Sequence, residues 1–157
     1  PNNIVFSPDG QFLFAALRSG GVSVLSTKIP DDITLLDTEA IPGLVQSLAV
    51  SSDGRHLFAL SSSIVAIFSF DPVAGNLRLE RSFEHGLSIS PFFGVEQIAL
   101  DATETRLFIS ANGQVAVFTT FGLPLGTVAG VAGPGGLAIC RFEDKHKHDG
   151  DDSCRPV

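Results

Sequence analysis

The sequence contains an internal repeat. Three stretches that begin at Ile4, Leu48 and Ile98 align with one another without a gap over eleven residues. Each stretch is an apolar run, a polar turn and a second apolar run that ends in Phe, and a further apolar run follows after a short gap. The copies start 44 and 50 residues apart. A period of this length is typical of a unit of four antiparallel strands, which stacks on its neighbours to bury its apolar faces.

The turns and runs within the repeat favour strands. Residues 7–10 (SPDG) and 51–54 (SSDG) are hairpin turns in which glycine supplies the positive φ that the turn requires. The flanking runs are rich in Val, Ile, Leu and Phe and are apolar on both faces, as expected where sheets stack on both sides. Residues 76–81 instead alternate apolar and charged side chains, which indicates an outer strand with one face in water. No segment has a capped helical period, so the fold class is all-β.

The sequence therefore predicts a partial β-propeller of about twelve strands in three four-stranded antiparallel blades, at approximately residues 1–44, 45–93 and 94–135. Residues 136–142 parallel the start of the second repeat and predict the first strand of a fourth blade. The charged residues 143–157 are predicted to form an irregular, disordered tail. Three blades cannot close a ring, so the expected partners are the remaining blades of the same chain or a second copy. The missing initial Met and the stop inside a fourth repeat favour a fragment.

The middle repeat resembles the YVTN repeats of the lactonase-like bacterial β-propeller family. The resemblance rests on residues 45–59 (VQSLAVSSDGRHLFA) and 67–77 (IFSFDPVAGNL), with Phe58 where that family often has Tyr. It covers nearly all of the second blade and the first two strands of the first and third. It implies a propeller built from this repeat. The same repeat serves enzymes, binding proteins and surface proteins, so the resemblance alone implies no single activity.

Composition excludes several classes of protein. A net charge of −7, with only ten basic residues and those scattered, argues against a surface that follows nucleic-acid phosphates. No apolar run approaches the roughly 18 residues of a membrane-spanning helix. The 44% of hydrophobic and 17% of charged residues exclude disorder over most of the length. Because the first residue is not Met, the compartment stays open, with export favoured over the cytoplasm.

A long connection at residues 84–96 links the outer strand of the second blade to the inner strand of the third. Connections of this kind lie on the face of a propeller where ligands usually bind. His85, Phe92 and Phe93 are therefore the predicted ligand-binding residues. The alternative is that the two phenylalanines cover the seam between the blades, since Phe is mostly buried.

The C-terminal segment offers a possible metal site and a possible disulfide. His146 and His148 lie among four aspartates, but lysines occupy positions that a calcium loop needs for ligands, and a mixed-charge run is usually solvated. The sequence therefore predicts no metal site and no cofactor. Cys140 and Cys154 would form a disulfide worth about 2–3 kcal/mol in an exported protein and would stay thiols in the cytosol.

Three functional hypotheses remain open. The preferred one is a repeat scaffold that presents loops for protein or carbohydrate binding without chemistry of its own, since no nucleophile elbow or phosphate loop is present. The resemblance implies the second, part of a lactonase-like hydrolase related to 6-phosphogluconolactonase. Such a site would gather Arg or His side chains from several blades, and Arg18, His56, His85 and Arg106 are the only candidates, at positions expected to be inequivalent. The third is a structural module of a secreted repeat protein.

Overall fold

The computed structural model describes residues 1–29, 31–89 and 96–130. The strands in these residues form three separate four-stranded antiparallel sheets, each built from one contiguous part of the chain, as predicted. The first sheet comprises β1 (Ile4–Phe6), β2 (Phe12–Leu17), β3 (Gly21–Ile29) and β4 (Asp32–Glu39). The second comprises β5 (Val45–Val50), β6 (His56–Ser61), β7 (Ile64–Asp71) and β8 (Asn76–Glu84), and the third β9 (Gln97–Leu100), β10 (Arg106–Ala111), β11 (Gln114–Thr119) and β12 (Pro124–Ala129).

Several predicted features fall on residues that the structure does not describe. They are the strand at 136–142, the tail at 143–157, Cys140 and Cys154. In the described residues no helix is long and apolar enough to cross a membrane.

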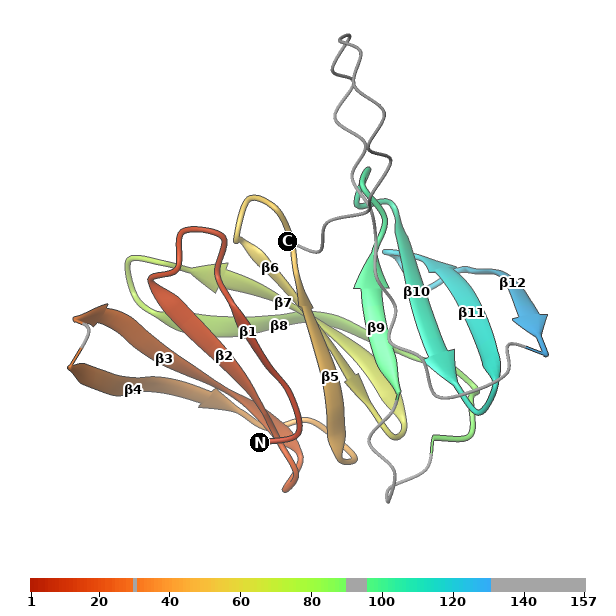
Figure 1. The fold of residues 1–157 in the computed structure, drawn as a ribbon, viewed down its shortest axis with the longest axis horizontal. Helices are drawn as coiled ribbons and strands as arrows, with labels where there is room; N and C mark the ends of the chain where they lie inside the picture. Colours follow the sequence, from red (N-terminus) through yellow and green to blue (C-terminus); the bar gives the residue numbers. More distant parts are fainter. Residues whose placement is uncertain (30, 90–95, 131–157) are drawn as a thin grey trace, which may run out of the picture.

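The three sheets stack in chain order around their first strands. Figure 1 shows β1, β5 and β9 side by side, with β4 and β12 at the outer edges. We call the contact between the first and second sheets the first seam, and that between the second and third sheets the second seam. Successive side chains of a strand point to opposite faces, so Leu57 of β6 is buried in the first seam and Phe58 in the second. Each seam has its own apolar core.

The predicted turns lie at matching places in successive sheets. In the second sheet, Ser51 Oγ donates to Asp53 Oδ1 (2.5 Å) and accepts from the backbone N–H of His56 (2.9 Å). Asp53 Oδ1 also accepts from the N–H of Arg55 (2.9 Å), and Gly54 has a φ of 69°. The turn of the first sheet repeats this arrangement, using Ser7, Asp9, Gly10, Gln11 and Phe12. Because the serine hydroxyl and the aspartate carboxylate both bond within the turn, they hold the short turn in one conformation.

The third sheet keeps the turn with the acid and the hydroxyl exchanged. Asp101 stands where the other copies have Ser, and its Oδ1 accepts from the N–H of Arg106 (3.0 Å). Thr103 stands where they have Asp and donates from Oγ1 to Asp101 Oδ2 (2.7 Å). Glu104 occupies the glycine position with a φ of 57°. Its Oε1 accepts from the N–H of Ser52 (2.6 Å), which ties this turn to the turn of the second sheet.

Side-chain oxygens join the inner strands across the seams. The N–H of Leu48 donates to Asn3 Oδ1 (3.0 Å) across the first seam. The N–H of Ile98 donates to Ser47 Oγ (3.3 Å) across the second. Asn3 and Ser47 occupy the same place in the repeat, so each inner strand is tied to the next by the same kind of bond.

The outward faces of the two end sheets are less covered than the seams. Ile4 is 52% exposed, whereas its equivalents Leu48 and Ile98 are 4% and 5% exposed. On the opposite side, Phe14 and Phe58 are buried, whereas their equivalent Phe108 is half-buried. Side chains that close a seam in one copy therefore face outward in another, as expected when further sheets stack on both ends.

Candidate ligand-binding sites

His85 fastens the connection after β8 to the end of β6. Its side chain is only 6% exposed, and its Nδ1 accepts from the N–H of Leu87 (3.1 Å). The proton is therefore on Nε2, which donates to the backbone oxygen of Ser61 (3.1 Å). Burial lowers the pKa of His85, so that the ring is neutral. Both ring nitrogens are thus bonded within the chain, while Phe92 and Phe93 lie outside the described residues.

We expect His85→Asn to reduce the pH dependence of stability between about pH 7.5 and about pH 5. The folded pKa of His85 lies below the unfolded value of about 6.5. Below that value the unfolded chain binds more protons, so the contribution of His85 to the free energy of unfolding, fully present above it, is lost as pH falls. The Asn Oδ1 can still accept from Leu87. Urea unfolding at the two pH values measures the slope.

The control for this experiment is His56→Asn, which leaves the buried imidazole of His85 in place. In this variant, the part of the pH dependence of the free energy of unfolding that comes from His85 should be the same as in the wild type. A slope that is the same in the His85 variant and the wild type would contradict a neutral, buried ring.

The four Arg and His candidates for a lactone site do not converge. Arg18 follows β2 and His85 lies at the end of β6, so both are at one end of the sheets. His56 and Arg106 begin β6 and β10 at the opposite end. The expectation that all four positions are inequivalent is wrong for this pair, because Leu57 pairs with Phe68 as Leu107 pairs with Phe118, which places His56 and Arg106 at the same register. Arg106 Nε lies 3.8 Å from Asp101 Oδ2.

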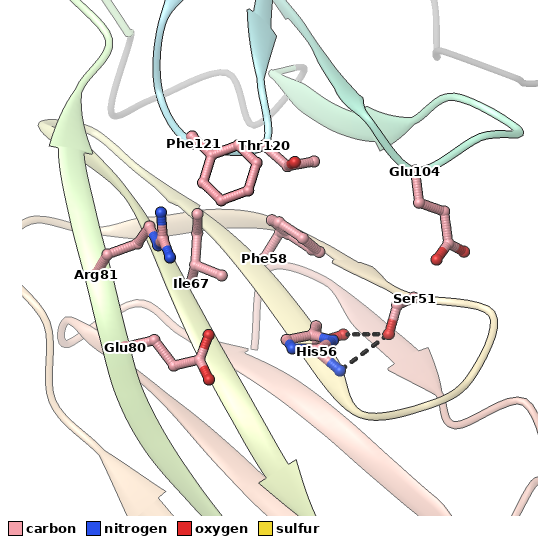
Figure 2. A pocket seen from close by; sticks show the side chains of 9 residues that line it. All are labelled: Ser51, His56, Phe58, Ile67, Glu80, Arg81, Glu104, Thr120 and Phe121. Atoms are coloured by element: carbon pink, nitrogen blue, oxygen red, sulfur yellow. Dashed lines mark hydrogen bonds between the residues drawn. The ribbon is translucent and has the colours of Figure 1, made fainter.

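A cleft of about 230 Å³ opens at the second seam, at the end where the β5–β6, β9–β10 and β11–β12 turns lie (Figure 2). The second and third sheets both contribute to its walls. The lining residues are Ser51, His56, Phe58, Ile67, Glu80, Arg81, Glu104, Thr120 and Phe121.

The cleft combines an apolar back wall with charged groups at its edge. Phe58 and Ile67 form the back wall, and the guanidinium of Arg81 lies 4.8 Å from the centre of the Phe121 ring. The β7–β8 pairing shifts register so that Glu80 is an extra residue on β8, a bulge that turns Glu80 and Arg81 toward the same seam. The carboxylate of Glu80 points toward His56 across the cleft (Figure 2).

Ser51 and His56 lie together in this cleft without forming a nucleophile–base pair. The dashed lines in Figure 2 join Ser51 Oγ to the backbone nitrogen (2.9 Å) and oxygen (3.2 Å) of His56, not to its ring. The hydroxyl also donates to Asp53 (2.5 Å). Ser7 makes the same bonds in the first sheet, where Phe12 replaces the histidine. The hydroxyl therefore serves the turn rather than an imidazole base.

A second hollow, of about 420 Å³, lies between the inner strands and involves Phe6, Val50 and Leu100, which occupy one place in the repeat. Its lining is mainly apolar and carries Asp101 and Glu104 at one end. Among the residues that the structure describes, no three His, Cys, Asp or Glu side chains are grouped so that they could hold a metal ion.

No family model and no curated protein matches this sequence. The fold matches solved structures closely. A functionally unknown protein from Desulfotomaculum acetoxidans DSM 771 is 43% identical with a TM-score of 0.84, over 91% of this chain and 47% of that one. The β-propeller domain of Cps50 (Swd1) from Myceliophteria thermophila is 20% identical with a TM-score of 0.65, over 81% of this chain and 40% of that domain. The chain has the fold of a partial β-propeller.

The partial propeller also matches a periplasmic gluconolactonase from Pseudomonas aeruginosa, at 22% identity and a TM-score of 0.66, over 80% of this chain and 38% of that one. The chain spans less than half the length of each of these three structures. The similarity to the gluconolactonase is therefore a similarity of fold.

Proposed function

We propose that this partial propeller is a binding scaffold, consisting of three blades of a larger ring that present sites for a protein or carbohydrate ligand without chemistry of their own. The observation that carries the proposal is the geometry of Ser51 and His56. The cleft places a hydroxyl beside a histidine, but the hydroxyl is bonded to the turn backbone and to Asp53. This geometry favours a binding surface over a catalytic site with an activated serine nucleophile.

The outward faces of the end sheets support the larger ring. Ile4 and Phe108 occupy places whose equivalents are buried in a seam. Remaining blades of the same chain, or a second copy that completes a six-bladed ring, would cover these faces. The blade boundaries would then lie near residues 44 and 93. The connection with His85, Phe92 and Phe93 stays a second predicted place for a ligand.

The alternative is a lactonase-like hydrolase. Two observations favour it: the fold likeness to the gluconolactonase and the matching positions of His56 and Arg106 in adjacent blades. A complete ring could direct further basic side chains toward this pair.

The two functions are separated by a lactone hydrolysis assay. We expect the chain to leave the hydrolysis rate of glucono-δ-lactone and of its 6-phosphate at the buffer value, measured by base uptake at constant pH, with heat-denatured chain as the control. Acceleration that disappears in the double variant His56→Ala with Arg106→Ala would overturn the scaffold proposal in favour of the hydrolase.

A further inference from the structure

The two seams can be compared position by position, because the sheets are copies of one unit. In the first seam, Phe70 of β7 packs edge-on against Phe12 and Phe14, with ring centres 4.9 and 5.0 Å apart. The equivalent of Phe70 in the third sheet is Thr120. The N–H of Phe70 donates to Arg55 O (2.7 Å), as the N–H of Thr120 donates to the same place one repeat later, Thr105 O (3.0 Å).

The second seam lacks two of these three rings. His56 stands in place of Phe12, Thr120 in place of Phe70, and only Phe58, the equivalent of Phe14, remains aromatic. The space at this point is about 230 Å³, against about 130 Å³ at the corresponding point of the first seam. Protein interiors are otherwise close-packed. In the first seam, phenylalanines at these places leave a smaller space, so the larger cleft arises from specific replacements.

The outer edge of the cleft also lacks contacts that are present at the same place in the first seam. In the first seam, the bulge residue Leu36 packs on Gly75, and Asp37 Oδ2 accepts from the N–H of Leu77 (2.8 Å), so both residues make contacts across the edge. The equivalent residues of the second seam are Glu80 and Arg81. The Glu80 side chain has no hydrogen bond or ion pair to any residue that the structure describes, and its carboxylate faces the cleft (Figure 2).

We propose that this cleft binds a neutral polyhydroxy ligand of the size of one sugar ring. This inference deepens the proposed binding function and rests on it. A hydroxyl group both donates and accepts, and the cleft offers an acceptor at Glu80, a donor at Arg81 and a ring at His56 that can do either. The apolar back wall and the Phe121 ring suit the C–H face of a sugar.

Charge and size narrow the ligand class. Glu80 and Arg81 carry opposite charges on neighbouring positions of the wall, while the Glu104 carboxylate is already bonded to the N–H of Ser52, so an ionic ligand of either sign meets a like charge beside its partner. A ligand without net charge meets neither penalty. The cleft volume of about 230 Å³ is below the roughly 300–1,000 Å³ of sites that hold drug-sized molecules, which favours a single ring.

The test is an NMR titration of the ¹⁵N-labelled chain with D-glucose, D-galactose and D-mannose, together with D-glucosamine as a cation and D-gluconate as an anion. We expect at least one neutral hexose to shift the amide signals of Glu80, Arg81 and Thr120 with a dissociation constant in the millimolar range. The charged sugars should bind more weakly there. Tighter binding of a charged sugar, or no shift of these signals by any hexose at about 100 mM, would overturn the inference.

Two variants test the site itself. The double variant His56→Phe with Thr120→Phe places in the second seam the ring pair that fills this part of the first seam, so it should fold, narrow the cleft and lose the hexose shifts. Glu80→Ala should weaken binding about tenfold. Glu84→Ala, on the same strand with the same charge change, should leave it unchanged. Wild-type binding by either of the first two variants contradicts the inference.

Different results would contradict the scaffold proposal and the proposed sugar site. A cleft that binds no hexose in a chain that does not hydrolyse lactones removes this ligand and leaves the scaffold, with the connection at 84–96 as its remaining predicted place. Lactone hydrolysis removes the scaffold proposal, and with it this inference.

Discussion

Replacing Leu57 by alanine is expected to lower the free energy of unfolding by about 3 kcal/mol. Leu57 is fully buried in the first seam, where its side chain lies in the core shared by the first and second sheets. Its equivalent Leu13 is half-buried on the outward face of the first sheet. Leu13→Ala should therefore cost about 1 kcal/mol or less, since less apolar surface returns to water and the site can collapse. Urea unfolding followed by circular dichroism measures both.

Leu107→Ala is the matched control for this comparison. Leu107 is fully buried in the second seam at the same place of the repeat, so its loss should resemble that of Leu57. Equal losses at Leu13 and Leu57 would mean that the outward face of the first sheet is covered in solution. Light scattering at two protein concentrations would then show whether a second copy covers it.

Gly20→Ala should cost about 3 kcal/mol, which combines backbone strain with a steric clash. Gly20 lies in the β2–β3 turn with a φ of 86°. A Cβ added there would lie 2.8 Å from the backbone oxygen of Gly43 and 2.9 Å from that of Ile41. These oxygens belong to the link between the first and second sheets, and backbone atoms cannot rotate away as a side chain can.

Gly10→Ala separates the two contributions. Gly10 has a φ of 69°, and no heavy atom lies within 4 Å of an added Cβ, so only conformational strain of about 1 kcal/mol is expected. If thermal unfolding gives the same loss for both substitutions, the link at residues 41–43 must yield, and the predicted clash is absent.

The fold could be predicted because the same turn and the same apolar runs recur in each copy of the repeat. The turns at Asp9-Gly10 and Asp53-Gly54 lie at matching places as predicted, and the apolar runs beside them are paired strands. The outer strands of the first and third sheets were not identified from the sequence. In β4 two apolar residues, Leu35 and Leu36, stand side by side at the bulge and break the two-residue alternation, whereas the bulge of β8 falls on the charged residue Glu80. In β12, Pro124 and Gly126 interrupt the strand pattern.

The cleft could not be predicted from the pattern alone. The alignment places His56 in the column of Phe12, and this departure was available from the sequence. The partner of that column lies on the following sheet, where Thr120 replaces Phe70. Which columns meet across a seam depends on how the sheets stack, and only the structure provides that relation. His85 presented a related difficulty, because a polar residue in a long connection can be either solvated or, as found, buried and bonded.

The contiguity of each sheet has a consequence for how the chain is made. Every described sheet is completed by strands that are neighbours in sequence, so none waits for a segment synthesised much later. Contacts that are local in sequence form quickly, and a blade can assemble soon after its residues leave the ribosome. The emerging chain then exposes to chaperones only the apolar face of the most recently formed sheet. If synthesis stalls between two repeats, the nascent chain contains complete sheets and few unpaired strands.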